Sequence, residues 1–474
     1  HGGGAAESTL YDCKISLNSA TSTGSTPSGG GAYECSMYHC ILCDNVVIGP
    51  AGHESYGSGS YGGTLDGCNI YGNTTDGAGT AGGGGTAFGT LINCSLSNNV
   101  VHSSYGWAFG GGAYQGVLNN CTVSSNTTSW KGGGVYLSKL SNCVVMYNQS
   151  LKYGGGASDS TLIKCTVISN RTINFDSNMG GGGTYGGILS NCYVIGNSAY
   201  FGGGSYSSVL YSCSVNSNIA LNDGAGAYAS VLWNSVLIGN VASNYAGGAY
   251  TSTLNNCTLC GNMGGGVGYS ALTNCINYYN TPYDSDEENV PNTFNHSCAS
   301  NIMSGEGNIT NEPLFVDYLN GDYHLLSNSS CIDNGTNLTS AWKDYEGIPR
   351  PLDGNDDGVA RSDIGAYEYI HPLSDTDGDG TKDSDEVISG TSPADQGDFF
   401  HIIGSENESI GDIVSWQSVV GRVYEIQVIT NLTNGIWVEL PDYTNLPGYG
   451  GILSITNPNP SMSDYYRITV KLAP

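Results

Sequence analysis

The feature that most constrains this chain is a residue pattern that recurs twelve times before residue 281. Each copy has Gly nine positions before a Cys or Ser anchor and Asn five positions after it. Leu lies three positions before the anchor in every copy except one, which has Met37, and an aliphatic residue lies two positions after it in every copy except one, which has Asn277. The anchors are Cys13, Cys40, Cys68, Cys94, Cys121, Cys143, Cys165, Cys192, Cys213, Ser235, Cys257 and Cys275.

Successive anchors are 18–28 residues apart, most often 22. This period is too short for a helical-pair repeat, and the Gly runs distinguish it from a leucine-rich repeat. Short β-rich pieces broken by Gly and Asn are typical of solenoids whose repeats stack strand on strand. The sequence therefore predicts an all-β chain in which each copy is one coil of a right-handed parallel β-helix.

Stacking explains the residue types. We expect the Leu, Cys and aliphatic positions to point inward as apolar ladders, with Cys acting as a small hydrophobe. The Asn is expected at a corner in left-handed backbone conformation, with its amide bonded to the Asn of the next coil. The Gly run is expected at a second corner where a Cβ does not fit. All length variation falls between the Asn and the next Gly, so one edge of the rod carries every insertion, and binding is expected there.

The GGGAY…VxxN layout resembles the repeats of bacterial polymorphic outer-membrane and autotransporter-like β-helices. The stretches NEPLFVDYLNGDYHLLSNSSCIDNG (311–335) and EGIPRPLDGNDDGVARSDIGAYEY (346–369) resemble the closing segment of choice-of-anchor Q secreted bacterial proteins. This resemblance implies export and an extracellular or cell-surface location.

Four parts are predicted. Residues 1–280 form the twelve-coil β-helix, and 281–370 form further coils and a C-terminal cap over its open end. Residues 371–397 form a calcium-binding linker. Residues 398–474 alternate apolar and polar residues between Pro, Gly and Asn turns, which indicates a small β-sandwich.

The segment DTDGDGTKDSDE (375–386) carries the strongest chemical motif. Its oxygen donors have the spacing that a hard cation with six or seven oxygen ligands requires, and Gly380 allows the sharp turn. It resembles thrombospondin type-3 and dockerin calcium loops, whereas the alternative is a solvated acidic linker. The predicted calcium ligands are Asp375, Asp377, Asp379, Thr381 through its carbonyl, Asp383 and Glu386.

DGNDDGVARSD (353–363) has a similar spacing at Asp353, Asn355 and Asp357, but Ile364 stands where the last acidic ligand would be. A turn held by side-chain hydrogen bonds explains this segment as well as a metal site does.

Sixteen cysteines would ordinarily suggest a disulfide framework. The ladder cysteines lack the paired spacing and His partners of zinc sites, so we expect them to be buried free thiols. Of the other five, Cys298 and Cys331 flank the cap and could pair, Cys35 lies near Cys43 in the sequence, and Cys260 has no obvious partner.

Charge excludes several functions. Residues 281–474 hold 7 Lys/Arg against 31 Asp/Glu, which argues against nucleic acid or anionic membrane as a partner. No uninterrupted apolar stretch is long enough to span a bilayer, and we expect a mature chain whose export signal has been removed.

Two kinds of function remain. An extracellular structural or adhesive protein is expected, which assembles with itself head to tail through its first coil. The alternative is a protein that binds or degrades polysaccharide, like the lyases that share this fold. No evident cluster of carboxylates marks an active site, so no enzyme is expected, but aromatic side chains follow both the coils and the variable edge. These could bind sugars or only pack together.

The recurrent Tyr lies seven positions before the anchor, at Tyr33, Tyr61, Tyr114, Tyr136, Tyr185, Tyr206, Tyr228 and Tyr250. The variable edge adds Tyr105, Trp107, Phe109, Trp130, Tyr153, Phe175, Tyr200, Phe201 and Tyr245.

Overall fold

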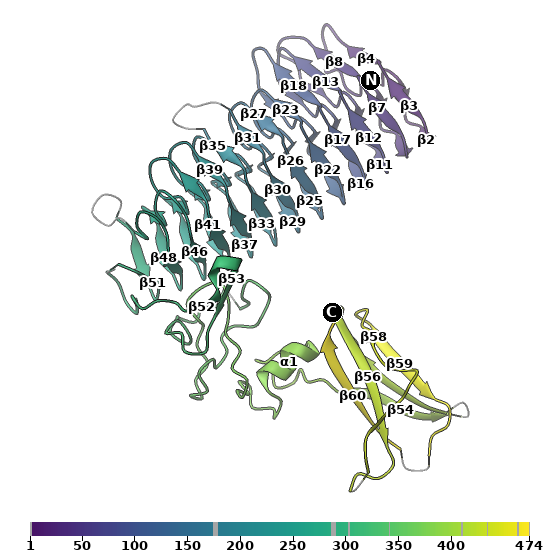
Figure 1. Ribbon diagram of the computed structural model, residues 1–474. Helices are drawn as coiled ribbons and strands as arrows, with labels where there is room; N and C mark the ends of the chain where they lie inside the picture. The colour runs from purple at the N-terminus through teal and green to yellow at the C-terminus, as the bar shows by residue number, and fades with distance from the viewer. Residues whose placement is uncertain are drawn as a thin grey trace. The chain divides into compact units, whose positions relative to one another are not determined.

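The computed structural model describes residues 2–173, 179–285, 291–301, 304–340, 342–408, 411–433, 435–461 and 464–473. It consists almost entirely of β-strands and divides into two compact units. The first contains residues 1–347 and 363–367, and the second contains residues 348–362 and 368–474. The predicted parallel β-helix is confirmed in the first unit (Figure 1).

Four parallel sheets form the sides of the helix. The first runs from β1 (Ala5–Ala6) to β47 (Val267–Gly268) and the second from β2 (Thr9–Tyr11) to β50 (Thr293–Asn295). The third runs from β3 (Lys14–Ser16) to β51 (Cys298–Ala299) and the fourth from β4 (Ser19–Thr21) to β43 (Val241–Ala242). The coil of Cys143 shows the repeat: β24 (Val135–Tyr136), β25 (Lys139–Ser141), β26 (Val144–Met146) and β27 (Gln149–Ser150).

Equivalent residues pair in register from coil to coil, as Leu140 does with Leu162 and Val145 with Val167. Because strand residues alternate between faces, Leu and the aliphatic residue after the anchor point inward and are buried along the whole rod. The predicted apolar ladders are therefore confirmed.

Each coil turns at four residues with positive φ. In the coil of Cys143 these are Gly132, Leu137, Asn142 and Tyr147, with φ of 67°, 49°, 53° and 55°. The prediction that the recurrent Asn itself is left-handed is wrong, because the residue before it adopts that conformation. The residue at the turn points outward, where many side chains fit, while the Asn that follows directs its amide into the coil.

The predicted amide ladder is confirmed. The backbone N–H and the Nδ2 of Asn126 both donate to Oδ1 of Asn148, at 2.9 Å each. Asn148 repeats both bonds to Asn170, and its Nδ2 also donates to the Val123 carbonyl at 2.8 Å. Every polar atom of these buried amides is therefore satisfied, which is the condition for burying them without a large free-energy cost.

The Gly column packs directly against this amide ladder. A Cβ on Gly134 would lie 2.5 Å from the carbonyl oxygen of Gly156 and 3.0 Å from Cγ of Asn148. Both contacts are shorter than ordinary van der Waals distances, so the predicted exclusion of a Cβ at this corner is confirmed.

The anchor cysteines also lie at a corner and form hydrogen bonds, in addition to filling the core. The Cys121 backbone N–H donates to Sγ of Cys143 at 3.3 Å, and that thiol donates to the Ser141 carbonyl at 3.2 Å. Ser235 replaces Cys because its hydroxyl accepts the same bond, from the Cys213 N–H at 3.0 Å. Hydrogen bonding therefore explains the exchange of Cys for Ser better than hydrophobicity does.

All sixteen cysteines are free thiols in the structure, and all except Cys13 are buried. Cys35 lies at another inward corner, where its thiol donates to the Tyr33 carbonyl. Cys43 and Cys260 each end a strand of the third sheet, β7 (Ile41–Cys43) and β46 (Thr258–Cys260).

The Asn ladder ends at a carboxylate. Asn280 donates to Oδ1 of Asp284 from its backbone N–H at 2.8 Å and from its Nδ2 at 3.0 Å. Asn277, which breaks the aliphatic column, is buried here because its Oδ1 accepts from Asn280 and its Nδ2 donates to the Asp284 carbonyl. Beyond this point β50 and β51 add a thirteenth coil on two sides.

Residues 311–347 and 363–367 pack against the side of the last coils, whereas the sequence predicts a cap over their end. The hairpin of β52 (Phe315–Asp317) and β53 (Asp322–Leu325), joined by the 3-10 helix η1 (Tyr318–Asn320), supplies Phe315, Tyr323 and Leu325 to a buried cluster. The cluster includes Val236, Cys260, Ile276 and Cys298, which occupy outward positions on the third sheet. This segment therefore covers one outer face of the rod.

The second unit contains α1 (Asp383–Ser389) and the predicted C-terminal β-sandwich, whose core centres on Trp416 and Tyr424. Its strands are antiparallel and form two sheets. They are β54 (Ile402–Glu408), β55 (Gly411–Gln417) and β59 (Ile452–Asn457) in one sheet, and β56 (Arg422–Ile429), β57 (Val438–Glu439), β58 (Leu446–Pro447) and β60 (Tyr465–Leu472) in the other.

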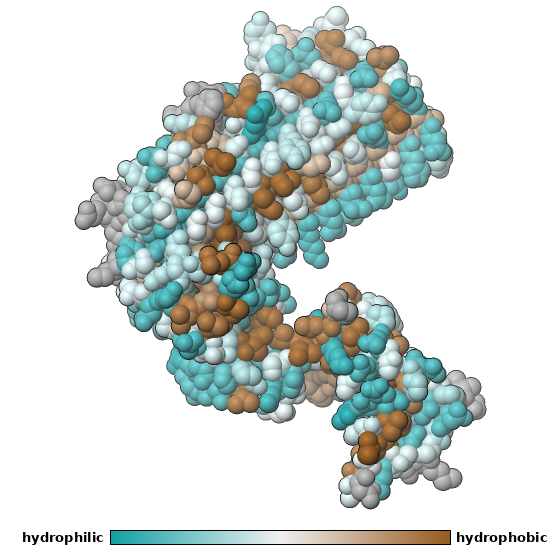
Figure 2. All heavy atoms as spheres, viewed as in Figure 1, coloured by the Kyte–Doolittle hydropathy of each residue, from teal (hydrophilic) through white to brown (hydrophobic). Residues whose placement is uncertain are grey.

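The surface of the rod is mixed in character. Figure 2 shows hydrophobic and hydrophilic side chains interspersed along its visible face. Among the described residues, no helix has the length and apolarity needed to cross a membrane.

Replacing Asn148 by Ala should destabilise the β-helix. The substitution leaves the backbone N–H and Nδ2 of Asn126 without their acceptor, at a cost of about 1–3 kcal/mol for each buried donor. Urea titration followed by circular dichroism measures the loss. Asn119→Ala, at an exposed outward position, is the matched control and should cost under about 0.5 kcal/mol. Equal stability of the two variants would contradict the role assigned to the ladder.

The ladder thiols of Cys121, Cys143, Cys165 and Cys192 should resist alkylation in the folded protein because they are buried. Denaturation without reductant should make all four reactive. Mass spectrometry of alkylated peptides gives the result directly, and disulfides between successive rungs would show that this account of the ladder is mistaken.

Candidate functional site

Three successive coils carry long insertions at the variable edge that contain a strand of their own. Their added residues form β9 (Ser55–Tyr56), β14 (Ala81–Gly82) and β19 (Ala108–Phe109), which pair in parallel as a short fifth sheet. The insertions are therefore ordered by the same stacking that forms the rod, and they extend one edge of it.

The loops before these strands enclose a cleft of about 570 Å³. Tyr105 and Trp107 line it with 88% and 58% of their surfaces exposed. His53, Glu54 and Thr80 supply side-chain hydrogen-bonding groups, and Gly52, Gly79 and Gly106 keep the backbone accessible. Large aromatic rings beside a few polar groups on rigid strands are typical of a ligand site.

An aromatic row continues from the cleft along the rod. The rings of Trp107 and Trp130 stack with their centroids 6.5 Å apart, and Nζ of Lys152 lies 3.8 Å from the Trp130 centroid. In the next part of the edge, Nζ of Lys131 lies 4.9 Å from the Tyr185 ring and 3.4 Å from Oδ2 of Asp159. Each of these successive coils therefore places an aromatic ring or a lysine side chain on the variable edge.

The recurrent Tyr residues stack on one another from coil to coil. Tyr206 and Tyr228 stack at 4.8 Å, and Tyr228 and Tyr250 stack at 5.5 Å. Aromatic residues of the variable edge cover the stack from the side, as Phe109 does over Tyr136 at 4.3 Å. Burial raises the pKa of Tyr136 to about 12. For these rings, packing is the better explanation of the two that the sequence allows.

Among the edge aromatics that the sequence predicts and the structure describes, Tyr105 and Trp107 are the exposed ones. Phe175 lies outside the described residues. The sequence places all of these residues on one edge, but it does not separate rings that pack from rings that face solvent. The only sequence signal that could have identified the exposed rings is their position just before the inserted strands.

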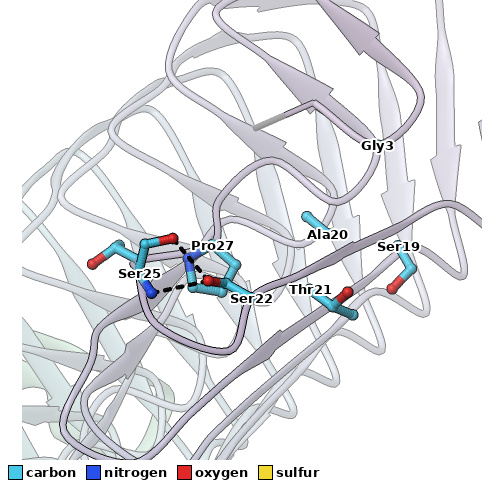
Figure 3. A pocket seen from close by; sticks show the side chains of 8 residues that line it. Gly3, Ser19, Ala20, Thr21, Ser22, Ser25 and Pro27 are labelled. Carbon is cyan, nitrogen blue, oxygen red and sulfur yellow. Dashed lines mark hydrogen bonds between the residues drawn. The ribbon is translucent and has the colours of Figure 1, made fainter.

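A second cleft, of about 330 Å³, lies at the first coil and is drawn in Figure 3. Its lining consists of Gly, Ala, Pro, Ser and Thr, and Ser22 and Ser25 bond to each other within it. Because these residues include neither an aromatic ring nor a titratable side chain, this cleft offers little for recognition.

The acidic loop of the second unit is the other candidate site. Among the residues that the structure describes, Asp375, Asp377 and Asp379 are the one group of three or more His, Cys, Asp or Glu side chains whose ligand atoms lie within 4.8 Å of one another. Backbone N–H groups of Gly380 and Thr381 donate to Asp375 and Asp379, which wraps the loop around the three carboxylates.

The other predicted ligands take different positions. Asp383 begins α1 and accepts hydrogen bonds from the N–H and Oγ1 of Thr376, at 2.7 and 2.6 Å. Glu386, one helical turn later, is 0% exposed. Among the described residues, its carboxylate oxygens and the buried Oδ2 of Asp377 have no hydrogen bond of normal geometry, although the side chain of Thr391 partly offsets the rise in the Glu386 pKa. Burial, followed by the charges of Asp377, Asp379 and Asp383, raises the pKa of Glu386 to about 7.

Buried carboxylate oxygens beside other carboxylates fit a bound divalent cation. The structure brings Asp375, Asp377 and Asp379 within reach of one ion, while Asp383 is engaged by Thr376. The charges of Asp377 and Asp379 act on Glu386, which stays a predicted ligand. The carbonyl of Thr381 stays a predicted ligand.

The loop at 353–363 shows the features of a hydrogen-bonded turn. Both carboxylate oxygens of Asp353 accept backbone N–H groups, from Asp357 at 3.1 Å and Gly358 at 2.7 Å. Asp357 pairs with Arg361 at 3.4 Å. Of the two explanations that the sequence leaves open, the turn accounts for these bonds.

Comparison with known proteins does not assign the chain to a family. No protein-family model matches the chain, and no curated protein matches it. Among solved structures, it resembles the pectate lyase Pel9A at 12% identity and a TM-score of 0.34, over 72% of this chain and 88% of that one.

Two further structures are similar. One is the tailspike protein gp49 from Acinetobacter baumannii bacteriophage Fri1, a capsular polysaccharide depolymerase, at 8% identity and a TM-score of 0.26, over 95% of this chain and 80% of that one. The other is the Dettilon tailspike protein gp208, at 10% identity and a TM-score of 0.22, over 98% and 87%. Likenesses this low transfer no site to this chain.

Proposed function

We propose that this protein is an extracellular adhesive β-helix that binds polysaccharide at the cleft formed by its three extended coils. The observation that carries the proposal is the exposure of Tyr105 and Trp107 in a cleft whose loops lead directly into paired strands. Among the other edge aromatics that the structure describes, Phe109 and Phe201 are buried and the rest are half-buried.

The side chains that line this cleft suit the binding of a sugar. The apolar face of a sugar ring stacks on an aromatic ring, while its hydroxyls need hydrogen-bond donors and acceptors nearby. His53, Glu54 and Thr80 offer both. Because strands β9, β14 and β19 fix the loops, little conformational entropy is lost on binding.

Binding without catalysis is the favoured form of this proposal. Glycoside hydrolysis generally needs two carboxyl groups on either side of the scissile bond, and Glu54 is the one Asp or Glu among the lining residues. Lyase action would need a base beside bound sugar and remains the alternative. Head-to-tail assembly through the first coil stays a prediction.

Replacing Trp107 by Ala should weaken polysaccharide binding about tenfold, which corresponds to about 1.4 kcal/mol for a lost stacking contact. A glycan array selects the ligand, and isothermal titration of the full chain then compares the variants. Tyr211→Ala removes an exposed ring from another side of the rod and should leave the affinity unchanged. Absence of any glycan ligand, or an equal loss in both variants, would refute the proposal.

We further propose that the loop at 375–386 binds calcium as a structural ion. The buried carboxylate of Glu386 beside Asp377 supports this, because ionising it without a cation is costly. The bound ion would join the loop to the first turn of α1 and thereby fix the start of the second unit.

Calcium should raise the melting temperature of the full chain, and chelation should increase proteolysis between residues 371 and 397. Asp379→Ala should abolish the calorimetric calcium signal. Asp357→Ala, in the neighbouring hydrogen-bonded turn, is the control and should preserve it. An unchanged signal in Asp379→Ala would exclude this site.

A further inference from the structure

Two cysteines from distant parts of the chain meet in the cluster that attaches residues 311–347 and 363–367 to the rod. Cys298 begins β51 in the thirteenth coil, and Cys331 belongs to the covering segment. Both side chains are 0% exposed and lie in the same hydrophobic cluster as Phe315 and Ile364.

Backbone bonds hold each cysteine firmly in place. The Cys298 N–H donates to the Cys275 carbonyl at 2.8 Å, and its thiol donates to the Asn311 carbonyl at 3.1 Å. The Cys331 carbonyl accepts from the Ile364 N–H at 2.9 Å, and its own N–H donates to Oγ of Ser329 at 3.2 Å. The Cys331 thiol, followed by burial, raises the pKa of Cys298, so the two thiols lie near each other within the cluster.

The ladder cysteines do not share this geometry. They stack in register, so their Cβ atoms are separated by the strand spacing of about 4.8 Å, while a disulfide needs about 3.5–4.5 Å. Each ladder thiol also has a corner hydrogen bond to keep, as Cys143 has with Cys121. Cys298 and Cys331 come from different elements and are free of this in-register constraint.

We propose that Cys298 and Cys331 form a disulfide that fastens residues 311–347 to the last coil. The two thiols lose two protons and two electrons as the S–S bond forms. A small-molecule disulfide, such as oxidised glutathione, accepts the electrons and is released as two thiols. Because both cysteines are buried in the finished fold, this exchange takes place before the covering segment has docked.

The bond would restrain a stretch of chain that is otherwise held to the rod by packing and by hydrogen bonds such as those between Thr336 and Asn274. It closes a loop of more than thirty residues, which restricts the unfolded chain and so favours the folded state. Its loss should therefore release the covering segment before the coils unfold. This inference is independent of the proposed carbohydrate binding.

The test is peptide mapping of the full chain, folded in a glutathione redox buffer and alkylated without reductant during denaturation. We expect one cross-linked pair, Cys298 with Cys331, while the ladder cysteines and Cys260 are alkylated. Cys260 is the internal control, because it lies in the same cluster. Alkylation of both Cys298 and Cys331, or cross-links dominated by other cysteines, would overturn the proposal.

A second measurement does not depend on the folding of a variant. The wild-type chain unfolded and refolded in reductant should melt several degrees below the oxidised chain and be cleaved more readily within 311–347. The Cys298→Ser/Cys331→Ser double variant should melt at the reduced temperature in both conditions. Identical melting of the oxidised and reduced wild-type chain would also overturn the proposal.

Discussion

The buried amide ladder is the interaction on which the rest of this structure depends. A coil of a β-helix has few residues, so its corners must satisfy several backbone groups in a confined interior. The recurrent Asn does this with one side chain, which accepts two bonds from the preceding coil and donates to the next coil. The Gly column is required because the amide and the next carbonyl occupy the space that a Cβ would need.

This arrangement separates the fixed part of each coil from the variable part. Nothing in the ladder depends on the residues between the Asn and the next Gly, so that edge accepts insertions of different lengths. Three neighbouring insertions pair with one another and form the cleft with Tyr105 and Trp107. Binding residues are thus added to the rod without disturbing its core, which is the usual relation between a rigid scaffold and its loops.

Much of the fold could be predicted because one pattern is repeated twelve times, so that Leu, Cys and Asn columns identify the coil and its inward residues. The left-handed residue before the Asn was missed because its outward side chain varies freely. The lateral position of residues 311–347 and 363–367 could not be inferred, since it rests on long-range contacts with residues such as Ile276. In the acidic loop, spacing predicted the three close carboxylates but not the capture of Asp383 by Thr376.

The central claim is that a rigid amide-laddered rod presents its ligand site on the inserted edge. Hydrogen–deuterium exchange of the full chain, with and without a bound polysaccharide, tests it most directly. The account predicts slow exchange throughout the coils in both states, with ligand protection confined to residues 51–54, 78–80 and 105–107. Ligand protection at another face would contradict it, and so would rapid exchange of the backbone N–H groups of the ladder Asn residues in the free protein.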